Sequence, residues 1–205
     1  VYSKYIKRAL DFIISLLALT VLSPLLLVLT LVGAVKMRGN PFFVQERPGR
    51  NGRVFRLIKL RSMTNEKKNG ELLPDEERLT GYGRFLRRTS LDELPELLNI
   101  LVGHMSIVGP RPLLVKYLPL YNEHQARRHE VRPGLTGWAQ VNGRNSITWE
   151  QKFDYDVWYV DHVSFALDVR IVMMTVRSVL KREGISGENN ATMAEFEGSR
   201  EKTNV

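Results

Sequence analysis

The chain lacks cysteine altogether and contains only four histidines. Without cysteine it can form no disulfide, use no thiol nucleophile and bind no zinc through thiolates. The four histidines show no H-E-x-x-H or similar spacing, so we expect no zinc site. Acidic residues are also scarce, with 22 against 30 lysines and arginines and a net charge of +8. Such a balance suits anionic lipid headgroups, phosphorylated substrates or nucleic acid.

One long apolar run, from Ala9 to Val35, lies near the beginning of the chain. It is long enough to cross a bilayer core, which takes about 20 apolar residues for roughly 30 Å. Basic residues mark the cytoplasmic side of membrane helices. Here they flank both ends, with Lys4, Lys7 and Arg8 before the run and Lys36 and Arg38 after it. A straight spanning helix would have to export one of these basic flanks.

A Ser23-Pro24 pair interrupts the apolar run near its middle. Proline removes a backbone hydrogen bond and kinks a helix. The arm that follows, residues 25–35, is only about 16 Å long and is too short to cross alone. We therefore predict that residues 1–38 form a re-entrant helix broken at Ser23-Pro24, with Ser23 bonding a carbonyl that Pro24 frees. The alternatives are a kinked single span and a signal peptide, although a signal peptide has a shorter apolar core.

For the residues that follow, 39–184, we predict one cytoplasmic α+β domain. It is expected to be mainly helical, with a small β-hairpin and interfacial helices. The hairpin is expected because β-prone runs at 42–45 and 54–60 flank Pro-Gly and Asn-Gly turn signals. Helical spacing predicts helices over 92–102, over 113–130 with a break at Pro119, and over 149–182 as a pair meeting near 163–164. Segment 64–80 is expected to be mobile or a short helix, segment 131–146 a loop or short strand, and the polar tail 185–205 disordered.

The Asp92-Glu93 pair has two interpretations. Acids before an apolar helical run often cap the helix, and Ser90-x-x-Glu93 fits a capping box. Alternatively, a helix start beside Arg87 and Arg88 is an anion site, because backbone N–H groups and guanidinium forks both match phosphate oxygens. A carboxylate placed there could attack phosphorus or hold a metal ion.

Two further arginines lie in tight turns. Gly109-Pro110-Arg111-Pro112 presents Arg111 between prolines that restrict the backbone on both sides, although a solvated turn residue is the plain alternative. Arg144 lies in an Asn-Gly-Arg-Asn turn, which on its own is weak evidence for a binding site. The C-terminal helices carry several acids, most of them expected on helix surfaces, and one or two could bind metal or pair with arginines. They are Asp154, Asp156, Asp161 and Asp168.

Three stretches, FVQERPGRNGRVFRLIKLRSM, GRFLRRTSLDELPELLNILVGHMSIVGPRP and VRPGLTGWAQVNGRN, together resemble the bacterial sugar transferases. The resemblance covers nearly all of residues 4–182 and follows the family's motif order. It points to the small stand-alone form, the monotopic phosphoglycosyl transferases, because no multi-span N-terminal region precedes the motifs. The re-entrant anchor inferred above is also a feature of this family.

The resemblance implies an enzyme that moves a sugar 1-phosphate from a UDP-sugar to undecaprenyl phosphate and releases UMP. The sugar would be an N-acetylated amino sugar such as diacetylbacillosamine, in glycoconjugate or protein glycosylation. The enzyme would require Mg²⁺ and lie on the cytoplasmic face of the bacterial inner membrane, with both termini cytoplasmic. Asp92 matches the nucleophile and Glu93 its dyad partner, with Asp92 and Asp168 as candidate metal ligands. The basic positions expected to bind phosphate or nucleotide are Lys59, Arg61, Arg87, Arg88, Arg111 and Arg144.

Two other classes of function remain open at this point. A non-catalytic, membrane-anchored binder of anionic lipid or glycan intermediates would not need Asp92. A membrane-tethered nucleic-acid binder would show steeply salt-dependent affinity. The arginines, however, gather around a carboxylate pair and Pro/Gly turns, and not along one helix, so we expect no nucleic-acid partner.

Overall fold

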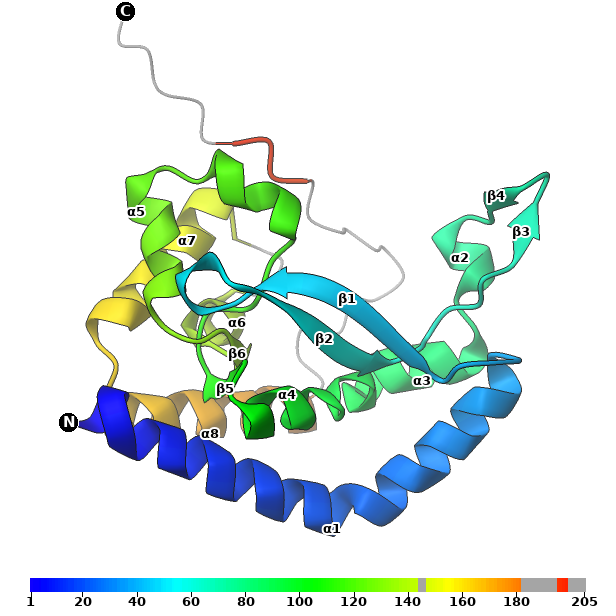
Figure 1. Ribbon diagram of the computed structural model, residues 1–205, viewed down its shortest axis with the longest axis horizontal. Helices are drawn as coiled ribbons and strands as arrows, with labels where there is room; N and C mark the ends of the chain where they lie inside the picture. Colours follow the sequence, from blue (N-terminus) through cyan, green and yellow to red (C-terminus); the bar gives the residue numbers. More distant parts are fainter. Residues whose placement is uncertain (144–146, 182–194, 199–205) are drawn as a thin grey trace, which may run out of the picture.

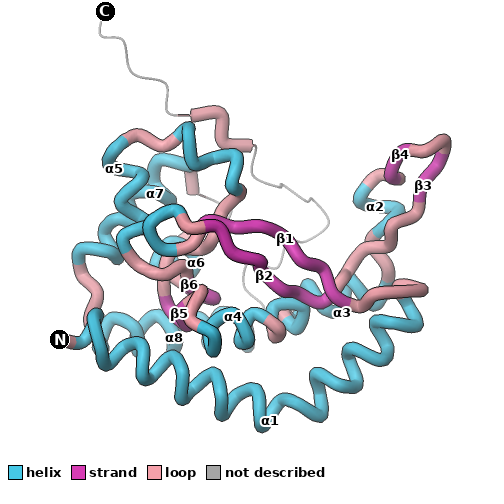
Figure 2. The backbone as a smooth tube through the Cα atoms, viewed as in Figure 1, coloured by secondary structure: helices cyan, strands magenta, loops and turns pink. Residues whose placement is uncertain are grey.

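The computed structural model describes residues 1–143, 147–181 and 195–198 of the 205-residue chain (Figure 1). The described part is mostly helical with three two-stranded sheets, which confirms the predicted class of a mainly helical chain with a β-hairpin (Figure 2). Its helices are α1 (Lys7–Lys36), α2 (Asp75–Arg78), α3 (Gly81–Thr89), α4 (Glu96–Val102), α5 (Glu123–Ala126), α6 (Trp138–Asn142), α7 (Trp149–Asp161) and α8 (Phe165–Lys181). Its strands are β1 (Phe42–Pro48), β2 (Val54–Leu60), β3 (Lys67–Lys68), β4 (Glu71–Leu72), β5 (Ser106–Val108) and β6 (Gly134–Thr136).

Helix α1 is bent near its middle, and both of its ends rise toward the rest of the protein (Figure 1). The helix is continuous across Pro24, so it bends where the sequence predicted a break. Pro24 has no N–H for the carbonyl of Thr20, and the hydroxyl of Ser23 donates to that carbonyl at 2.9 Å. The predicted role of Ser23 is therefore confirmed. This substitute bond lets the helix continue through the bend.

One side of α1 packs against the rest of the protein, and the opposite, outer side is exposed. Leu29 is buried with Leu60 and Leu86, while Ala18, Leu19 and Leu22 pack on the cluster that contains Leu97 and Ile100. The outer side exposes large apolar residues along its length, among them Phe12, Ile13, Leu17, Val21, Val28, Leu31 and Val35. Among the described residues, Tyr2–Lys36 is the one helix long and apolar enough to cross a membrane.

The predicted hairpin is confirmed as the antiparallel pair β1–β2, in which Phe42 faces Leu60 and Pro48 faces Val54. Buried Asn99 of α4 ties this hairpin to the helix. Its side-chain oxygen accepts from the backbone N–H of Ile58 at 3.1 Å, and its amide donates to the carbonyl of Arg56 at 2.8 Å. The hairpin and α4 therefore hold a fixed position relative to each other. Segment 64–80 contains the short pair β3–β4 and the short helix α2.

The predicted helices begin and end differently in several places. Helix α4 begins at Glu96, because Ser90 adopts a left-handed conformation (φ 55°) and a 3₁₀ turn at Leu91–Glu93 precedes the helix. Segment 113–130 forms two 3₁₀ turns around α5, and segment 131–146 contains β6 and α6. The pair α7 and α8 meets at residues 162–164, as predicted.

Strands β5 and β6 form a small parallel pair that the sequence did not predict. The backbones of these two segments approach so closely that a Cβ on Gly134 would lie 2.1 Å from the backbone nitrogen of Gly109. Glycine is required at this contact, because any side chain would collide with the facing backbone. The close approach positions the Gly109–Pro112 turn that follows β5.

Helix α8 carries an exposed apolar stripe. Its residues Phe165, Val169, Met173 and Val176 are all exposed and follow helical spacing.

The tail differs from the expectation of disorder in one place. Most of segment 185–205 lies outside the described residues. Within it, Phe196 is 4% exposed and packs on the rings of Tyr117, Tyr121, Trp149 and Phe153.

Candidate active site

Asp92 and Glu93 lie in the 3₁₀ turn between α3 and α4. The capping interpretation does not fit this turn. Ser90 makes no side-chain cap hydrogen bond, and α4 has Pro95 at its N-cap position. The carboxylate of Glu93 binds side chains from other segments, where a capping box would need it to bind the backbone. The turn therefore presents both acids to neighbouring elements.

Glu93 holds two cations on one carboxylate oxygen. Its Oε1 atom lies 2.8 Å from Lys59 Nζ and 2.6 Å from the guanidinium of Arg111. Burial raises the pKa of Glu93, but the charges of Arg111 and Lys59 outweigh burial and lower it to about 2. Glu93 is therefore ionised, and it joins β2, the 3₁₀ turn and the turn after β5 into one charged cluster.

Glu96 is a member of this cluster that the sequence did not reveal. Its carboxylate lies 3.0 Å from Lys59 Nζ, and the residue is only 3% exposed. Burial raises its pKa against the opposing charge of Lys59. The available signal was an acid in the first turn of an apolar helix, three residues after Glu93. Lys59 is thus held in place by two carboxylates.

Asp92 is half-buried beside Glu93. Burial raises the pKa of Asp92 and the charge of Glu93 raises it further, while Lys59 and Arg111 act in the opposite direction. In the described part of the chain, no other side chain donates a hydrogen bond to its carboxylate. Glu93 is held by two cations, whereas the Asp92 carboxylate is hydrogen-bonded to its own backbone.

A pocket of about 660 Å³ adjoins this cluster and is lined by both charged and apolar side chains. The charged lining residues are Glu93, Arg87, Arg111, Arg128, Lys152 and Asp156. The apolar lining residues include Ala18 and Leu22 from α1 and Val172, Val176 and Val179 from α8. Ser90 and Glu93 line the pocket on either side of Asp92, which is not itself a lining residue. The arrangement suits an amphiphile with an anionic head.

A buried ion pair that the sequence did not reveal supports Arg111. Arg128 and Asp156 are almost fully buried and lie 2.7 Å apart, and Arg128 also donates to the backbone carbonyl of Arg111 at 2.7 Å. Burial raises the pKa of Asp156, while Arg128 opposes the rise. The sequence left open that one or two of the C-terminal acids pair with arginines, and Asp156 is such an acid. Its position on the same face of α7 as buried Phe153 and Val157 was the overlooked signal.

The other predicted basic residues are placed differently from one another. Arg87 lines the pocket and donates to the Ser62 hydroxyl at 2.9 Å. This contact exists because α3 approaches closely at Gly83, where a Cβ would lie 1.8 Å from the carbonyl oxygen of Ser62. Arg61 is half-buried just after β2, and Arg88 is exposed on α3. Neither lines the pocket among its described residues, and Arg144 lies outside the described residues.

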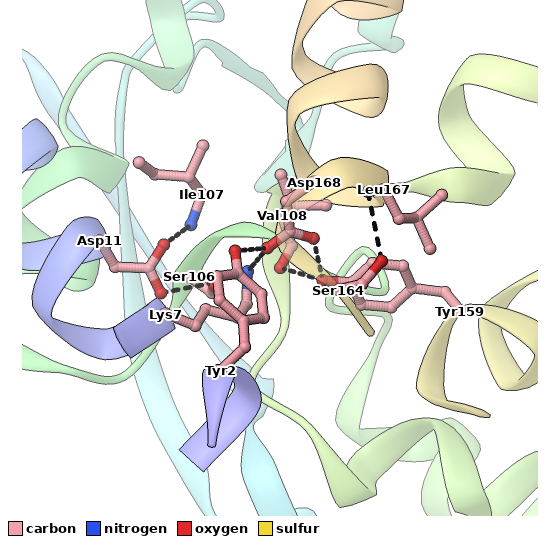
Figure 3. Close-up of polar contacts among 10 residues, drawn as sticks. All are labelled: Tyr2, Lys7, Asp11, Ser106, Ile107, Val108, Tyr159, Ser164, Leu167 and Asp168. Carbon is pink, nitrogen blue, oxygen red and sulfur yellow. Dashed lines mark hydrogen bonds and ion pairs between the residues drawn. The ribbon is translucent and has the colours of Figure 1, made fainter. Parts of the chain in front are cut away.

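Asp168 is placed in a different cluster, where α8 meets the beginning of α1 (Figure 3). Its Oδ2 atom accepts from Lys7 Nζ and from the Tyr2 hydroxyl, each at 2.6 Å. Its Oδ1 atom accepts from the Tyr159 hydroxyl at 2.7 Å. Both oxygens are engaged by residues of this cluster, so the structure does not present Asp168 as a ligand partner of Asp92.

A metal site would therefore have to be built differently from our expectation. Among the described residues, no group of three or more histidines and acids is placed to hold an ion. Mg²⁺ is commonly bound by only one or two carboxylates together with substrate phosphates. The Asp92 carboxylate and the second oxygen of Glu93 fit that requirement, because neither carries a side-chain hydrogen bond among the described residues.

Comparison with known proteins agrees with these observations. The family profile described as bacterial sugar transferase matches residues 2–182. The chain is 54% identical over 195 residues to a protein of Bacillus subtilis named uncharacterized sugar transferase EpsL, covering 95% of this chain and 96% of that protein.

Longer relatives carry more specific names. The chain is 39% identical to the UDP-glucose:undecaprenyl-phosphate glucose-1-phosphate transferase of Escherichia coli, covering 85% of this chain and 40% of that protein. It is 35% identical to the undecaprenyl-phosphate galactose phosphotransferase of Salmonella typhimurium, covering 89% of this chain and 42% of that protein. The chain thus spans about two fifths of these two relatives. The matched profile and the extent of these similarities show that the chain belongs to the bacterial sugar transferase family.

Proposed function

We propose that this protein transfers a sugar 1-phosphate from a UDP-sugar to undecaprenyl phosphate and releases UMP. The observation that carries the proposal is the contrast within the dyad. Glu93 is held by Lys59 and Arg111, whereas Asp92 keeps its carboxylate oxygens free of other side chains in the described structure. Asp92 is thus suited to attack, and Glu93 is suited to hold the cations that face a phosphate.

The reaction proceeds in two displacements at the sugar-bearing phosphorus. First, a carboxylate oxygen of Asp92 bonds to this phosphorus, the bond to the bridging oxygen breaks, and UMP leaves with that oxygen and its electron pair. Second, a phosphate oxygen of undecaprenyl phosphate bonds to the same phosphorus and the bond to Asp92 breaks. The carboxylate is regenerated and the product is an undecaprenyl diphosphate sugar. The raised pKa of Asp92 makes its ionised form more basic and hence a better nucleophile.

Positive side chains around the dyad reduce the repulsion between a carboxylate and a diphosphate. Arg111 is suited to this task, because its side chain is 45% exposed and its guanidinium keeps donors beyond the one bound to Glu93. Arg87 and Lys152 reach the same pocket. Mg²⁺ bound by Asp92 and Glu93 would neutralise further phosphate charge.

The charged and apolar lining residues of the pocket suit the lipid acceptor. A polyprenyl chain would lie against the apolar residues of α1 and α8, while its phosphate would face the charged residues. The soluble donor would approach the charged residues from the aqueous side. Because donor and acceptor arrive from different phases, a covalent intermediate lets them react one after the other.

We propose that α1 enters one leaflet and returns to the same face. Three observations support this: the bend at Pro24, the basic residues on both flanks, and the apolar residues on the outer side of the helix. The exposed stripe of α8 would lie at the membrane surface beside it. Both ends of α1 would then be cytoplasmic, at the inner membrane of a bacterium.

For the donor we propose an N-acetylated amino sugar such as diacetylbacillosamine, used in glycoconjugate or protein glycosylation. The support is the likeness to the small stand-alone members of the family. Curated relatives are named for glucose and galactose transfer, so the choice must be made by experiment. UMP release would be measured across a panel of UDP-sugars with undecaprenyl phosphate and Mg²⁺. We expect one N-acetylated amino sugar to be preferred, and a hexose preference would refute the sugar assignment.

The same assay tests the reaction itself. UMP release should depend on both the UDP-sugar and undecaprenyl phosphate for repeated turnover. No UMP from any donor in the panel would contradict the proposed reaction and favour a non-catalytic, membrane-anchored binder of anionic lipid or glycan intermediates.

A further inference from the structure

A second basic cavity lies at the turn between β1 and β2. It has a volume of about 490 Å³, and we call it the turn cavity. Arg50 and Arg53 line it from the turn, and His104 and Arg132 line it from the residues after α4 and before β6. Among its described lining residues none is acidic, and none is shared with the pocket beside Glu93.

The turn cavity is separate from the candidate active site. Strand β2 begins at Val54, which lines the turn cavity. Lys59, which pairs with Glu93, lies near the other end of the strand. A strand rises about 3.4 Å per residue, so these two positions are roughly 17 Å apart. A ligand in the turn cavity would therefore not contact Asp92.

Two guanidinium groups lie close to Gly103, which lines this cavity. Arg132 donates to the carbonyl of Gly103 at 2.9 Å, and Arg8 donates to the carbonyls of Ile100 and Leu101 at 2.6 and 2.8 Å. A Cβ on Gly103 would lie only 3.2 Å from the Arg8 guanidinium, so the two arginines meet at this residue. Burial lowers the pKa of Arg132, and the charges of Arg8 and Arg50 lower it further.

The acids that adjoin this cluster already have partners. Asp11 accepts from the Ser106 hydroxyl at 2.7 Å and from the backbone of Ile107 at 3.0 Å. The Glu130 carboxylate pairs with Arg127 at 3.1 Å, and only its backbone carbonyl reaches Arg50. Like charges gathered without a paired carboxylate repel one another, and an external anion would relieve that repulsion.

The cavity lies beside the segments that we place at the membrane surface. Arg8 belongs to α1 and follows the exposed apolar residues Tyr5 and Ile6. Val102, just before Gly103, is 64% exposed, and Val54 on the cavity wall is 49% exposed. Apolar residues next to arginines are typical of the headgroup zone of a bilayer.

We propose that the turn cavity binds a phosphate group at the membrane surface, supplied by the headgroup of an anionic lipid. Planar guanidinium groups bind phosphate oxygens in pairs, and the turn cavity offers Arg50, Arg53 and Arg132 for this purpose. The bound headgroup would hold the β1–β2 turn and the end of α4 at the bilayer. Free inorganic phosphate has the same chemistry and is the other source.

The experiment uses the full chain in neutral detergent micelles and measures thermal unfolding. Micelles are supplemented with phosphatidylglycerol, with phosphatidylcholine or with inorganic phosphate. The test variant is Arg50→Gln/Arg53→Gln, and the matched control is Lys67→Gln/Lys68→Gln, which removes the same charge from the exposed β3–β4 hairpin. Unfolding without additives shows whether each variant folds.

We expect phosphatidylglycerol to raise the unfolding temperature of wild type and control, and phosphatidylcholine to have no such effect. The Arg50→Gln/Arg53→Gln variant should need roughly tenfold more phosphatidylglycerol for the same shift, the scale of one or two lost charge-assisted hydrogen bonds. Stabilisation by inorganic phosphate alone, lost in this variant, would keep the site and assign it to soluble phosphate. An equal response of test variant and wild type, an equal loss in the control, or no response to either anion would overturn the proposal.

Discussion

Asp92 is half-buried and Asp168 is buried, but the oxygens of these two carboxylates are used in opposite ways. Asp168 accepts hydrogen bonds from Lys7, Tyr2 and Tyr159 on both of its oxygens (Figure 3). Asp92 receives no hydrogen bond from another side chain in the described part of the chain, although two cations lie beside it on Glu93. A carboxylate with filled acceptors holds segments together, whereas one with open acceptors can react or bind a ligand.

Substitutions at these two residues should therefore have different effects, one on activity and the other on stability. A change at Asp92 itself should reduce activity with little loss of folding. Changes at the Asp168 cluster should loosen the junction between α1 and α8.

Asp92→Asn should abolish turnover in a folded protein. Asparagine is nearly the same size as aspartate but forms no carboxyl-phosphate bond, so we expect activity to fall by more than about 10³-fold. UMP release measures activity, and thermal unfolding in detergent provides the control for folding. A variant that still turns over at a substantial rate would mean that another group attacks the phosphorus.

Asp168→Asn should mainly destabilise the protein. It leaves Lys7 partly buried without its counter-charge, and removing one partner of a buried ion pair costs about 3–5 kcal/mol. Denaturant or thermal unfolding in detergent would show this loss. The activity of the molecules that remain folded should stay near that of wild type. A folded variant of normal stability without activity would place Asp168 in the catalytic machinery after all.

Glu93 should give the protein a pH-dependent stability. The pKa of Glu93 is lowered to about 2 in the folded protein, against about 4.3 in the unfolded chain. Its stabilising contribution is therefore present above the unfolded pKa and is lost as the pH falls through the folded pKa. We expect wild type to exceed Glu93→Gln by about 2–3 kcal/mol near pH 6, with a gap that closes toward pH 2. A gap independent of pH would contradict the ion pairs seen at this residue.

Arg111→Lys should give the smallest effect of this series. It keeps the positive charge but loses the guanidinium fork, and we expect about 1–3 kcal/mol less transition-state stabilisation. The value of kcat/KM measures this loss, with Lys67→Gln as a control far from the pocket. Activity near wild type would mean that Arg111 is a solvated turn residue whose contact with Glu93 is incidental.

The residues recognised from sequence were those whose roles depend on local pattern or on family motifs. The hairpin followed from its turn signals, and the Ser23 bond followed from the carbonyl that Pro24 leaves free. Lys59, Glu93 and Arg111 matched motifs, and the structure brings these three together.

The residues missed or misplaced were those whose partners are distant in the chain. The Arg128–Asp156 pair and the Lys7–Asp168 pair depend on how helices meet, which no local spacing reports. Short elements such as β5 and α6 are stabilised by tertiary contacts, because a few residues have too little intrinsic preference to be predicted. Glu96 was overlooked because a buried acid among apolar residues makes sense only once Lys59 is placed beside it.

The most direct test of the account is the mass of the protein after reaction with donor alone. The full chain would be incubated with its UDP-sugar in the absence of undecaprenyl phosphate and analysed intact and after proteolysis. We predict that the protein gains the mass of one phospho-sugar, carried by the peptide that contains Asp92, and that Asp92→Asn gains nothing. An adduct on another residue, or UMP release dependent on the acceptor with no adduct at all, would contradict the assignment of Asp92 as the nucleophile.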